Sequence, residues 1–215
     1  METFGGCVKT IEERKNVESF WELIRYNKLC ITKDDWNNKE QWVYFLRNLV
    51  KDYDTLLDVG CHDCSITKDF KVPNKTGIDM FEKIGSIAEK YCTFKCMDMR
   101  DICKNFESKS FDVVCQLDTI EHLETIEEAD KLMVDMEILA KKLVVHMCPA
   151  NVVECENFHS DAYGLMEGYD YNNGREFNPL QHHLLQPTKD YYLEKGYGVR
   201  LYGGDLKKII AWKYV

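Results

Sequence analysis

The spacing of apolar residues changes along the chain and predicts where helices and strands lie. Residues 17–29 and 38–50 carry apolar side chains three to four positions apart, which is typical of amphipathic helices. From residue 55 onward, short apolar runs alternate with helix-like segments. The predicted strands are 55–59, 76–78, 93–96, 111–117 and 143–147. Between them, one helix is predicted to begin near Ser65, and three others are predicted at 81–91, about 100–106 and 127–142.

The order of these elements predicts a single α/β domain over residues 1–215. Five apolar strands separated by helices indicate a parallel sheet that is covered by helices on both faces. A further helix is predicted around 188–195, followed by strands at 197–202 and 207–214. Because these last two strands are so close in sequence, they must form an antiparallel hairpin. The hairpin is expected to end an otherwise parallel sheet.

Composition agrees with a folded domain and excludes some partners. The 215 residues are 45% hydrophobic and 30% charged, with a formal net charge of −9. Without clusters of Lys and Arg, no long nucleic acid is expected as a partner. No segment approaches the ~20 apolar residues of a membrane span, and the N-terminus lacks the apolar core of a leader peptide. We expect a soluble cytoplasmic protein with mostly buried, reduced cysteines; the oligomeric state is not predicted.

Acidic residues end three successive predicted strands. Asp58 and Gly60 end the first strand, Asp79 ends the second and Asp98 follows the third. In open parallel sheets, ligands bind at the carboxyl ends of the strands. Gly60 permits close approach to the backbone, and an acid in the position of Asp79 can accept hydrogen bonds from both ribose hydroxyls. Asp98, with Met99 beside it, can bond an adenine amino group while the thioether packs on the ring. Each acid alone can instead cap the following helix.

These motifs resemble those of the class I S-adenosylmethionine-dependent methyltransferases over about residues 40–215. That family has D-x-G-x-G-x-G after the first strand, acids after the second and third, and in one subgroup D-x-x-E-H-L after the fourth, here residues 118–123. The resemblance implies a Rossmann-like, seven-stranded, mostly parallel sheet of order 3-2-1-4-5-7-6 with strand 7 antiparallel, and S-adenosyl-L-methionine as cofactor. The cofactor-binding residues that it implies are Asp58, Gly60, Cys61, Asp79, Met80, Asp98, Met99, Leu117 and Asp118.

The chain departs from the family pattern in the turn after the first strand. Gly60 is present, but His62 and Cys64 replace the second and third glycines of the pattern. Their side chains are bulkier than glycine and can crowd the cofactor. Cofactor affinity is therefore the part of the resemblance that this departure affects most.

Cys61 and Cys64 also match other kinds of site. A CxxC pair between strand and helix is typical of redox proteins, and a zinc site would need a second pair, for which Cys92 and Cys96 have suitable spacing. The strand count and the proline positions argue against the redox interpretation. The predicted strand over 93–95 argues against zinc, because its side chains alternate between faces. We interpret these cysteines as packing residues of the turn and predict no metal site.

Candidate catalytic residues lie in two segments. Asp118 and Glu121 belong to the fourth motif, near the methionine end of the cofactor or the substrate, or else they occupy a helix N-terminus, where the dipole favours acids. Segment 151–187 resembles the substrate cover of the subgroup and contains NPLQHHL at residues 178–184. Within it, His183 is the first candidate for a general base and His182 the second, since adjacent side chains do not face the same way.

The expected function is methyl transfer by direct displacement to an oxygen or nitrogen atom of a small molecule, a sugar or a lipid precursor. The helices within residues 1–50 are expected to cap the cofactor site. Two alternatives stay open: methylation of a protein or RNA, and a cofactor-binding module that has lost turnover. Titration with S-adenosylmethionine separates the last alternative from the others, and a survey of acceptors separates the first two.

Overall fold

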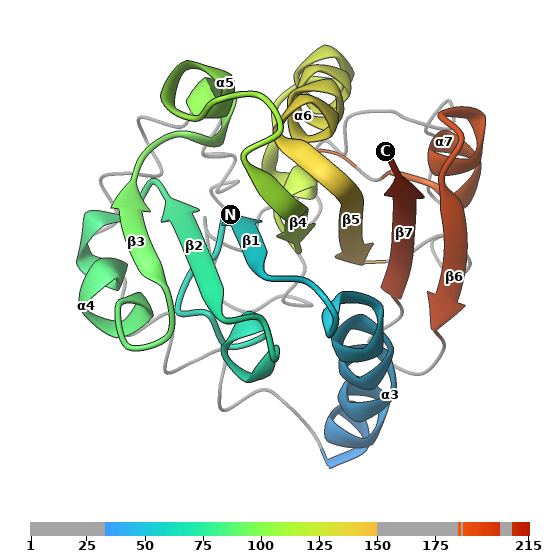
Figure 1. The fold of residues 1–215 in the computed structure, drawn as a ribbon. Helices are drawn as coiled ribbons and strands as arrows, with labels where there is room; N and C mark the ends of the chain where they lie inside the picture. Colours follow the sequence, from blue (N-terminus) through green and yellow to red (C-terminus); the bar gives the residue numbers. More distant parts are fainter. Residues whose placement is uncertain (1–32, 150–184, 186, 203–207) are drawn as a thin grey trace, which may run out of the picture.

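A seven-stranded sheet forms the centre of the molecule in the computed structural model, which describes residues 33–149, 185, 187–202 and 208–215 (Figure 1). The strand order is β3-β2-β1-β4-β5-β7-β6. Strand β7 pairs antiparallel with both β5 and β6, and the other neighbours are parallel. The predicted order and the antiparallel seventh strand are confirmed. The strands are β1 Thr55–Val59, β2 Asn74–Asp79, β3 Thr93–Cys96, β4 Phe111–Leu117, β5 Ala140–Pro149, β6 Gly198–Tyr202 and β7 Lys208–Tyr214.

Helices cover both faces of the sheet, as the sequence predicts. In Figure 1, α3 lies on the opposite side of the sheet from α5 and α6, and α7 lies beside β6. The described α-helices are α3 Lys33–Val50, α4 Gly85–Ala88, α5 Ile102–Asn105, α6 Ile126–Leu139 and α7 Lys189–Glu194. Single 3-10 turns occur at η1 Thr67–Asp69, η2 Glu82–Ile84, η3 Met99–Asp101 and η4 Ile120–His122.

Alternating side chains of the strands divide the core into two layers. Leu56 of β1 belongs to the layer that buries Trp42 and Leu46 of α3. The next residue, Leu57, belongs to the layer that buries Met136 of α6 and Tyr192 of α7. This alternation follows from the two-residue period of a strand, because successive side chains point to opposite faces. Apolar burial on both faces therefore fixes the register of the parallel strands.

One predicted helix is absent and another is shorter than predicted. The helix expected from about Ser65 is wrong, since only the turn η1 forms before the chain extends at Phe70. The ammonium group of Lys75 donates to the carbonyl oxygens of Thr67, Lys68 and Phe70 and so replaces the hydrogen bonds that a helix would supply.

The helix expected over 127–142 ends at Leu139, because Ala140 already pairs with Phe111 as part of β5. The segment expected as one helix over 81–91 consists of η2 followed by the short α4. Close packing at the start of α4 contributes to this departure from one continuous helix, since a Cβ on Gly85 would lie 2.8 Å from the Phe94 ring.

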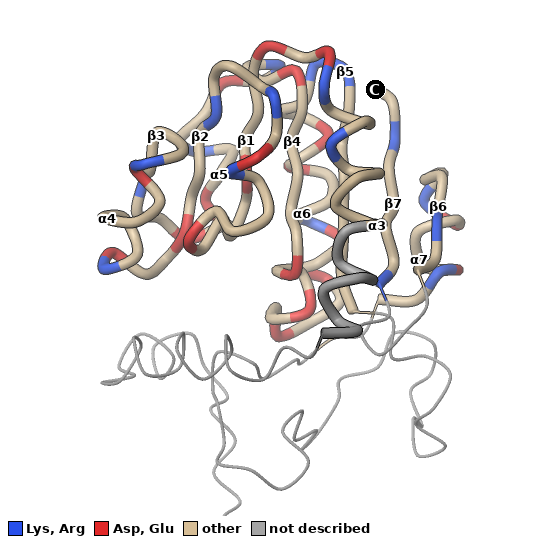
Figure 2. Tube along the Cα trace, turned by 90° about the horizontal axis from the view of Figure 1, so that it is seen from below, with Lys and Arg blue, Asp and Glu red and all other residues tan. Residues whose placement is uncertain are grey.

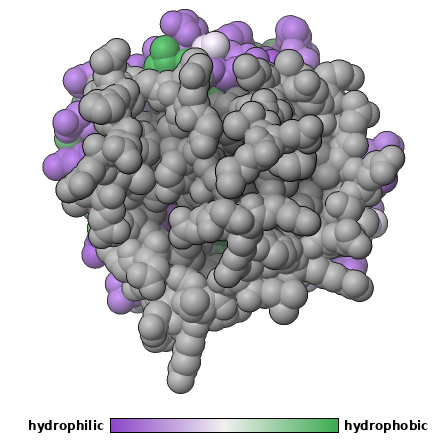
Figure 3. Space-filling model, turned by 180° about the vertical axis from the view of Figure 1, so that it is seen from behind, coloured by the Kyte–Doolittle hydropathy of each residue, from purple (hydrophilic) through white to green (hydrophobic). Residues whose placement is uncertain are grey.

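Charged residues of both signs are interleaved along the described trace, which shows no one-sided gathering of Lys and Arg (Figure 2). On the face in Figure 3, the described residues at the rim are mostly hydrophilic. Within the described ranges, no helix combines the length and the apolar character that crossing a membrane requires. The predicted helix at 17–29 and most of segment 151–187, including the NPLQHHL stretch, lie outside the described residues.

Candidate functional site

The turn after β1 has the backbone of a glycine-rich loop, although two of its glycines are replaced. Gly60 has φ 74°, His62 has φ 46° and Cys64 has φ 56°. All three values lie in the left-handed region, which costs a non-glycine residue about 1–2 kcal/mol. Gly60 itself is required for a second reason, because a Cβ there would lie 2.3 Å from the Thr119 methyl carbon. His62 and Cys64 therefore keep the local backbone shape that glycine favours.

Backbone hydrogen bonds hold this turn against β2. The N–H groups of Gly60 and Cys61 both donate to the carbonyl oxygen of Ile78, at 2.9 Å each. The N–H of His62 donates to Oδ2 of Asp79 at 3.0 Å, and the N–H of Phe81 donates to Oδ1 at 3.0 Å. Burial raises the pKa of Asp79. Asp79 thus ties together the ends of β1 and β2, and a carboxylate has capacity for further hydrogen bonds.

The buried side chain of Asp58 connects the end of β1 to Thr67, which follows the turn. The Asp58 carboxyl group accepts a hydrogen bond from the Thr67 hydroxyl at 2.7 Å, and the Cys115 thiol lies 3.8 Å from its other oxygen. Burial raises its pKa to about 7. The carboxyl group therefore contacts the core side of the turn.

Asp98 caps the turn η3, which is the capping role that the sequence left open. Its carboxylate accepts hydrogen bonds from the backbone N–H, Nε and Nη2 of Arg100 at 2.9, 3.1 and 2.7 Å. Arg100 also donates to Glu128 of α6 at 3.1 Å, and its pKa is raised by these two acids. Met99 packs, partly buried, against the core beside Asp98. The Cys96 thiol donates a hydrogen bond to the carbonyl oxygen of Met80, the residue after β2.

The fourth motif forms a charged cluster after β4. Asp118 has φ 61°, and both its carboxylate oxygens lie 2.6 Å from the ammonium nitrogen of Lys208. Glu121 is fully buried, and neither of its carboxyl oxygens has a hydrogen-bond partner. Burial, followed by the nearby Asp118, raises the pKa of Glu121 well above its usual range. Leu117, the last residue of β4, is buried in the layer that includes α3.

These two acids do not occupy the N-terminus of α6. That helix is capped by Thr125, whose hydroxyl accepts a hydrogen bond from Glu128 N–H, and the acids of its first turn are Glu127 and Glu128. Glu121 instead lies in the first turn of η4, and Asp118 precedes that turn.

Lys208 is the functional candidate that the sequence reasoning missed. Because β7 is antiparallel to β5, its first residue pairs with Pro149 at the carboxyl end of β5. This places a cation from the end of the chain beside Asp118, which precedes it by 90 positions. The signal in the sequence was a lysine at the start of the final strand of the predicted hairpin.

A chain of buried polar side chains positions the fourth motif. Gln116 Oε1 accepts from the N–H groups of Thr119 and Ile120 at 3.2 and 3.0 Å, so its Nε2 faces His146 Nδ1 at 3.3 Å. His146 Nε2 lies 3.3 Å from the Tyr197 hydroxyl, which donates onward to Glu137 at 2.8 Å.

The state of His146 follows from these neighbours. Since Nδ1 faces an N–H donor, His146 accepts there and is neutral. Burial lowers its pKa to about 3, in agreement with that state. The chain of side chains therefore holds the turn after β4 without a buried charge on the imidazole.

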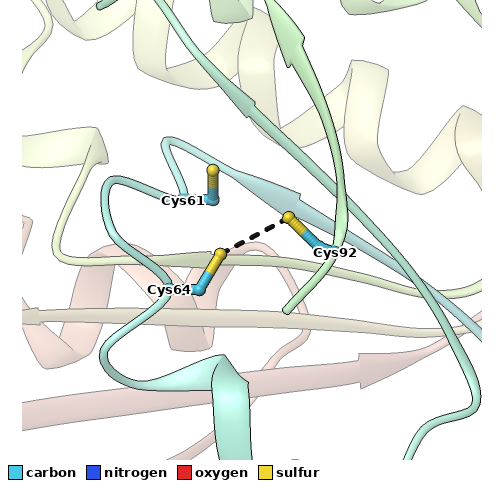
Figure 4. Close-up of side chains that lie close together, drawn as sticks. All are labelled: Cys61, Cys64 and Cys92. Atoms are coloured by element: carbon cyan, nitrogen blue, oxygen red, sulfur yellow. Dashed lines mark hydrogen bonds between the residues drawn. The ribbon is translucent and has the colours of Figure 1, made fainter. Parts of the chain in front are cut away.

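Three cysteines meet beside the turn after β1. Cys61 and Cys64 come from the turn and Cys92 from the residue before β3 (Figure 4). The Sγ atoms of Cys64 and Cys92 are 3.5 Å apart. Of the cysteines expected to complete a site, Cys92 joins the pair, whereas Cys96 is exposed and contacts Met80. The other candidates, His182 and His183, lie outside the described residues.

The sheet order and the arrangement of acids at the strand ends define the class of protein. A seven-stranded sheet of this order with an antiparallel seventh strand is the fold of class I S-adenosylmethionine-dependent methyltransferases. Residues 57–141 match a family described as "Methyltransferase domain". The match over residues 57–141 and the sheet order both point to the S-adenosylmethionine-dependent methyltransferases, whose cofactor is S-adenosylmethionine. No curated protein matches the sequence significantly.

Solved structures of several methyltransferases share the fold at low sequence identity. Magnesium protoporphyrin IX methyltransferase from Synechocystis PCC 6803, with bound S-adenosylhomocysteine, has TM-score 0.63 and 13% identity over 94% of this chain and 97% of that one. The N-methyltransferase NodS from Bradyrhizobium japonicum WM9 has TM-score 0.59 and 14% identity over 87% and 90%. An amino pentose methyltransferase from Micromonospora echinaspora has TM-score 0.57 and 18% identity over 89% and 96%.

Proposed function

We propose that the chain methylates a small molecule, a sugar or a lipid precursor, with S-adenosylmethionine held at the carboxyl ends of β1–β4. The observation that carries the proposal is the glycine-like turn after β1, which is hydrogen-bonded to Asp79 at the end of β2. A turn of this shape exposes its backbone to a ligand, and the neighbouring carboxylate has acceptor capacity for a ribose. The family match over residues 57–141 supports S-adenosylmethionine as that ligand.

Each candidate residue has a role in this proposal. Gly60 and Cys61 present backbone to the methionine part of the cofactor, Asp79 and Met80 bind the ribose side, Asp98 and Met99 bind the adenine, and Leu117 and Asp118 border the sulfonium. Asp58 acts from below by fixing the turn through Thr67. Asp98 shares its carboxylate with Arg100, so its contact with adenine uses the remaining acceptor capacity.

The acceptor is proposed to bind beside the fourth motif, at the methyl end of the cofactor. Methyl transfer from a sulfonium is a direct displacement, so the protein has to align the acceptor atom and exclude water. The ion pair between Asp118 and Lys208 and the carboxyl group of Glu121, which has no hydrogen-bond partner, offer hydrogen-bonding groups beside a polar acceptor. For a hydroxyl acceptor, His183 is the proposed base, with His182 as the second choice.

Support for a small acceptor comes from charge and from the fold relatives. Along the described trace, Lys and Arg are interleaved with Asp and Glu and do not gather on one side (Figure 2), which does not favour a nucleic acid. The fold relatives include enzymes named for magnesium protoporphyrin IX and for an amino pentose. Membership of the D-x-x-E-H-L subgroup, the division into N-terminal helices over 1–50 and a substrate cover over 151–187, and a cytoplasmic location remain predictions from the sequence.

Calorimetry followed by an acceptor survey tests the proposal. Titration of the full chain should show binding of S-adenosylmethionine and of S-adenosylhomocysteine and none of NAD. Micromolar NAD binding without S-adenosylmethionine binding would contradict the cofactor site. Transfer of labelled methyl groups to small hydroxyl or amine compounds supports the acceptor class, whereas labelling of protein or RNA alone, or tight binding without any transfer, contradicts it.

A further inference from the structure

The three cysteines beside the turn after β1 form a compact cluster of sulfur atoms. The Sγ atoms of Cys61, Cys64 and Cys92 all lie within 4.8 Å of one another, and the closest pair is 3.5 Å apart. Figure 4 shows the sulfurs of Cys64 and Cys92 pointing toward each other, with Cys61 beside them. Among the described residues, this is the one group of three or more His, Cys, Asp or Glu ligand atoms that lie so close together.

The surrounding structure is built to admit these sulfurs. A Cβ on Gly77 of β2 would lie 2.7 Å from Cys61 Sγ and 2.8 Å from Cys92 Sγ, so only glycine leaves room for them. Cys61 is 6% exposed and Cys64 is 1% exposed, whereas Cys92 is partly exposed, so the cluster is mostly buried and reaches the surface at Cys92. Ala88 of α4 packs against it as a small residue.

The backbone of Cys64 is a second sign that the cluster is more than packing. Its φ of 56° is a conformation that glycine adopts at little cost and that a residue with a Cβ does not. The D-x-G-x-G-x-G pattern has glycine at this position, so cysteine introduces backbone strain that glycine would avoid. What the cysteine adds is a sulfur atom facing Cys92.

The spacing of the sulfurs agrees with metal ligation. Zinc binds thiolate sulfur at about 2.3 Å in a tetrahedral arrangement, which separates two ligating sulfurs by roughly 3.8 Å. The observed separations therefore reach that geometry with side-chain movements of about 1 Å or less. Thiolate ligands select soft ions, chiefly zinc and copper(I), over magnesium or calcium.

We propose that Cys61, Cys64 and Cys92 bind a soft metal ion, zinc or copper(I), through three thiolates. The ion would join the turn after β1 to the residue before β3. Without it, the turn is held to β2 through its hydrogen bonds to Asp79 and Ile78. The remaining coordination position of zinc would hold a water molecule or an added ligand, whereas copper(I) is satisfied by the three sulfurs. The proposed role is structural and does not depend on the methyltransferase reaction.

The test measures metal content and metal affinity of the full chain, purified under reducing conditions and freed of metal by chelation. Zinc and copper(I) are added separately, and bound metal per chain is determined by mass spectrometry after removal of excess. Cobalt(II) serves as a spectroscopic probe, because thiolate-to-cobalt charge-transfer bands report the sulfur ligands. The expected result is one ion per chain for zinc, copper(I) or both, with the thiolate bands in the cobalt form and a raised Tm.

Cysteine variants separate this site from unspecific binding. Cys64→Ser and Cys92→Ser should each weaken binding more than about 100-fold, since loss of outer partners alone costs 10–100-fold. Cys103→Ser is the matched control, because Cys103 is exposed and contacts the Asp135 carbonyl instead, and it should bind as the wild type does. Circular dichroism of each variant verifies that it is folded.

Three outcomes would overturn the proposal. The first is a folded chain that binds neither zinc nor copper(I) at one ion per chain. The second is equal metal affinity in the wild type and in Cys64→Ser. The third is a metal-free protein that loses two hydrogens in air, with Cys64 linked to Cys92 by peptide mapping, and still takes up no metal after reduction; that result would identify a redox pair instead. If both single variants fail to fold, metal affinity is measured for Cys61→Ser and compared with the wild type. Weaker binding supports the proposal, and equal binding overturns it.

Discussion

The two halves of the candidate site satisfy their acids in different ways. In the cofactor half, which comprises the turns after β1, β2 and β3, Asp79 accepts hydrogen bonds from the neutral backbone groups of His62 and Phe81. In the acceptor half, which comprises the turn after β4 and the start of β7, Asp118 pairs with Lys208, and Glu121 is buried without a hydrogen-bond partner. The cofactor half is held by backbone donors and by Arg100, two residues from Asp98, whereas the acceptor half depends on a cation from a distant part of the chain.

This difference indicates what each half is prepared for. Backbone donors give a fixed shape that suits a cofactor of constant structure. A buried carboxyl group without a hydrogen-bond partner is costly unless a further group satisfies it, and such groups are typical of sites that receive a polar ligand. The acceptor half should therefore be sensitive to charge and pH, and the cofactor half to backbone shape.

The largest expected effect comes from Lys208→Met. Removing the cation leaves the Asp118 carboxylate without its ion-pair partner, and breaking a largely buried pair costs about 3 kcal/mol in the free energy of unfolding. Urea denaturation measures the change. Lys213→Met is the control, because its pair with Glu137 is more exposed and should contribute about 1 kcal/mol or less. A cost that persists fully in an Asp118→Asn background would show that Lys208 acts through other contacts.

Gly60→Ala should break the cofactor half. The added Cβ would meet the Thr119 methyl at 2.3 Å, and alanine also disfavours φ 74°. We expect a loss of about 2–3 kcal/mol in unfolding free energy and no cofactor binding by calorimetry. Gly196→Ala is a matched control, since Gly196 has φ 80° with no atom within 4 Å of the added Cβ, and it should cost only the backbone strain, about 1 kcal/mol. Equal costs for both variants would show that packing on Thr119 is unimportant.

Asp79→Ala tests the cofactor half without a clash. We expect cofactor binding to weaken by about 1.5–3 kcal/mol, the range for a charge-assisted hydrogen bond to the ribose, while the protein stays folded. Asp69→Ala removes a surface acid that pairs with Arg47 and should leave cofactor affinity unchanged. If Asp79→Ala binds normally and Asp98→Ala does not bind, the assignment of the ribose contact to Asp79 is wrong.

The smallest net effect is the pH dependence of stability, because the contributions of His146 and Asp58 oppose each other between pH 6.5 and 3.8. The pKa of His146 is about 3 in the folded chain and near 6.5 when unfolded, so the unfolded chain binds the proton first. The contribution of His146 to the unfolding free energy should therefore fall by up to about 1.4 kcal/mol per pH unit as pH drops from 6.5 toward 3. Asp58, with its raised pKa, contributes the opposite slope between pH 7 and 3.8.

The variant His146→Gln separates the two groups, because Asp58 is common to both proteins. The difference between the wild-type and variant stability curves should therefore show the histidine slope alone. Curves that run parallel from pH 6.5 to 4 would mean that His146 does not bind a proton on unfolding.

Much of the cofactor half could be predicted from the sequence, and little of the acceptor half. Apolar strands that end in Gly60, Asp79 and Asp98 are local patterns, so period and spacing were enough to find them. Lys208 comes from the antiparallel strand β7, and its contact with Asp118 depends on the register of β5 and β7, which the sequence does not state. The joining of Cys92 to the turn after β1 depends on long-range packing over Gly77 in the same way.

Tertiary contacts explain why two of the predicted helices differ from the structure. The segment after Ser65 has helix-forming residues, but the Lys75 ammonium satisfies its carbonyl oxygens and β2 begins at Asn74. The residues 140–142 continue an apolar and basic helical pattern, yet pairing of Ala140 with β4 and the ion pair of Lys142 with Asp112 hold them in β5. In both places tertiary contacts override local propensity.

A crystal structure of the full chain with S-adenosylhomocysteine tests the central claim most directly. The account predicts the ligand at the carboxyl ends of β1–β4, with its ribose hydroxyls within hydrogen-bond distance of Asp79, its sulfur toward Asp118, and the backbone of Gly60 against its amino acid part. A ligand bound elsewhere, or a ribose contact made by another residue while Asp79 keeps only its bonds to His62 and Phe81, would contradict the account.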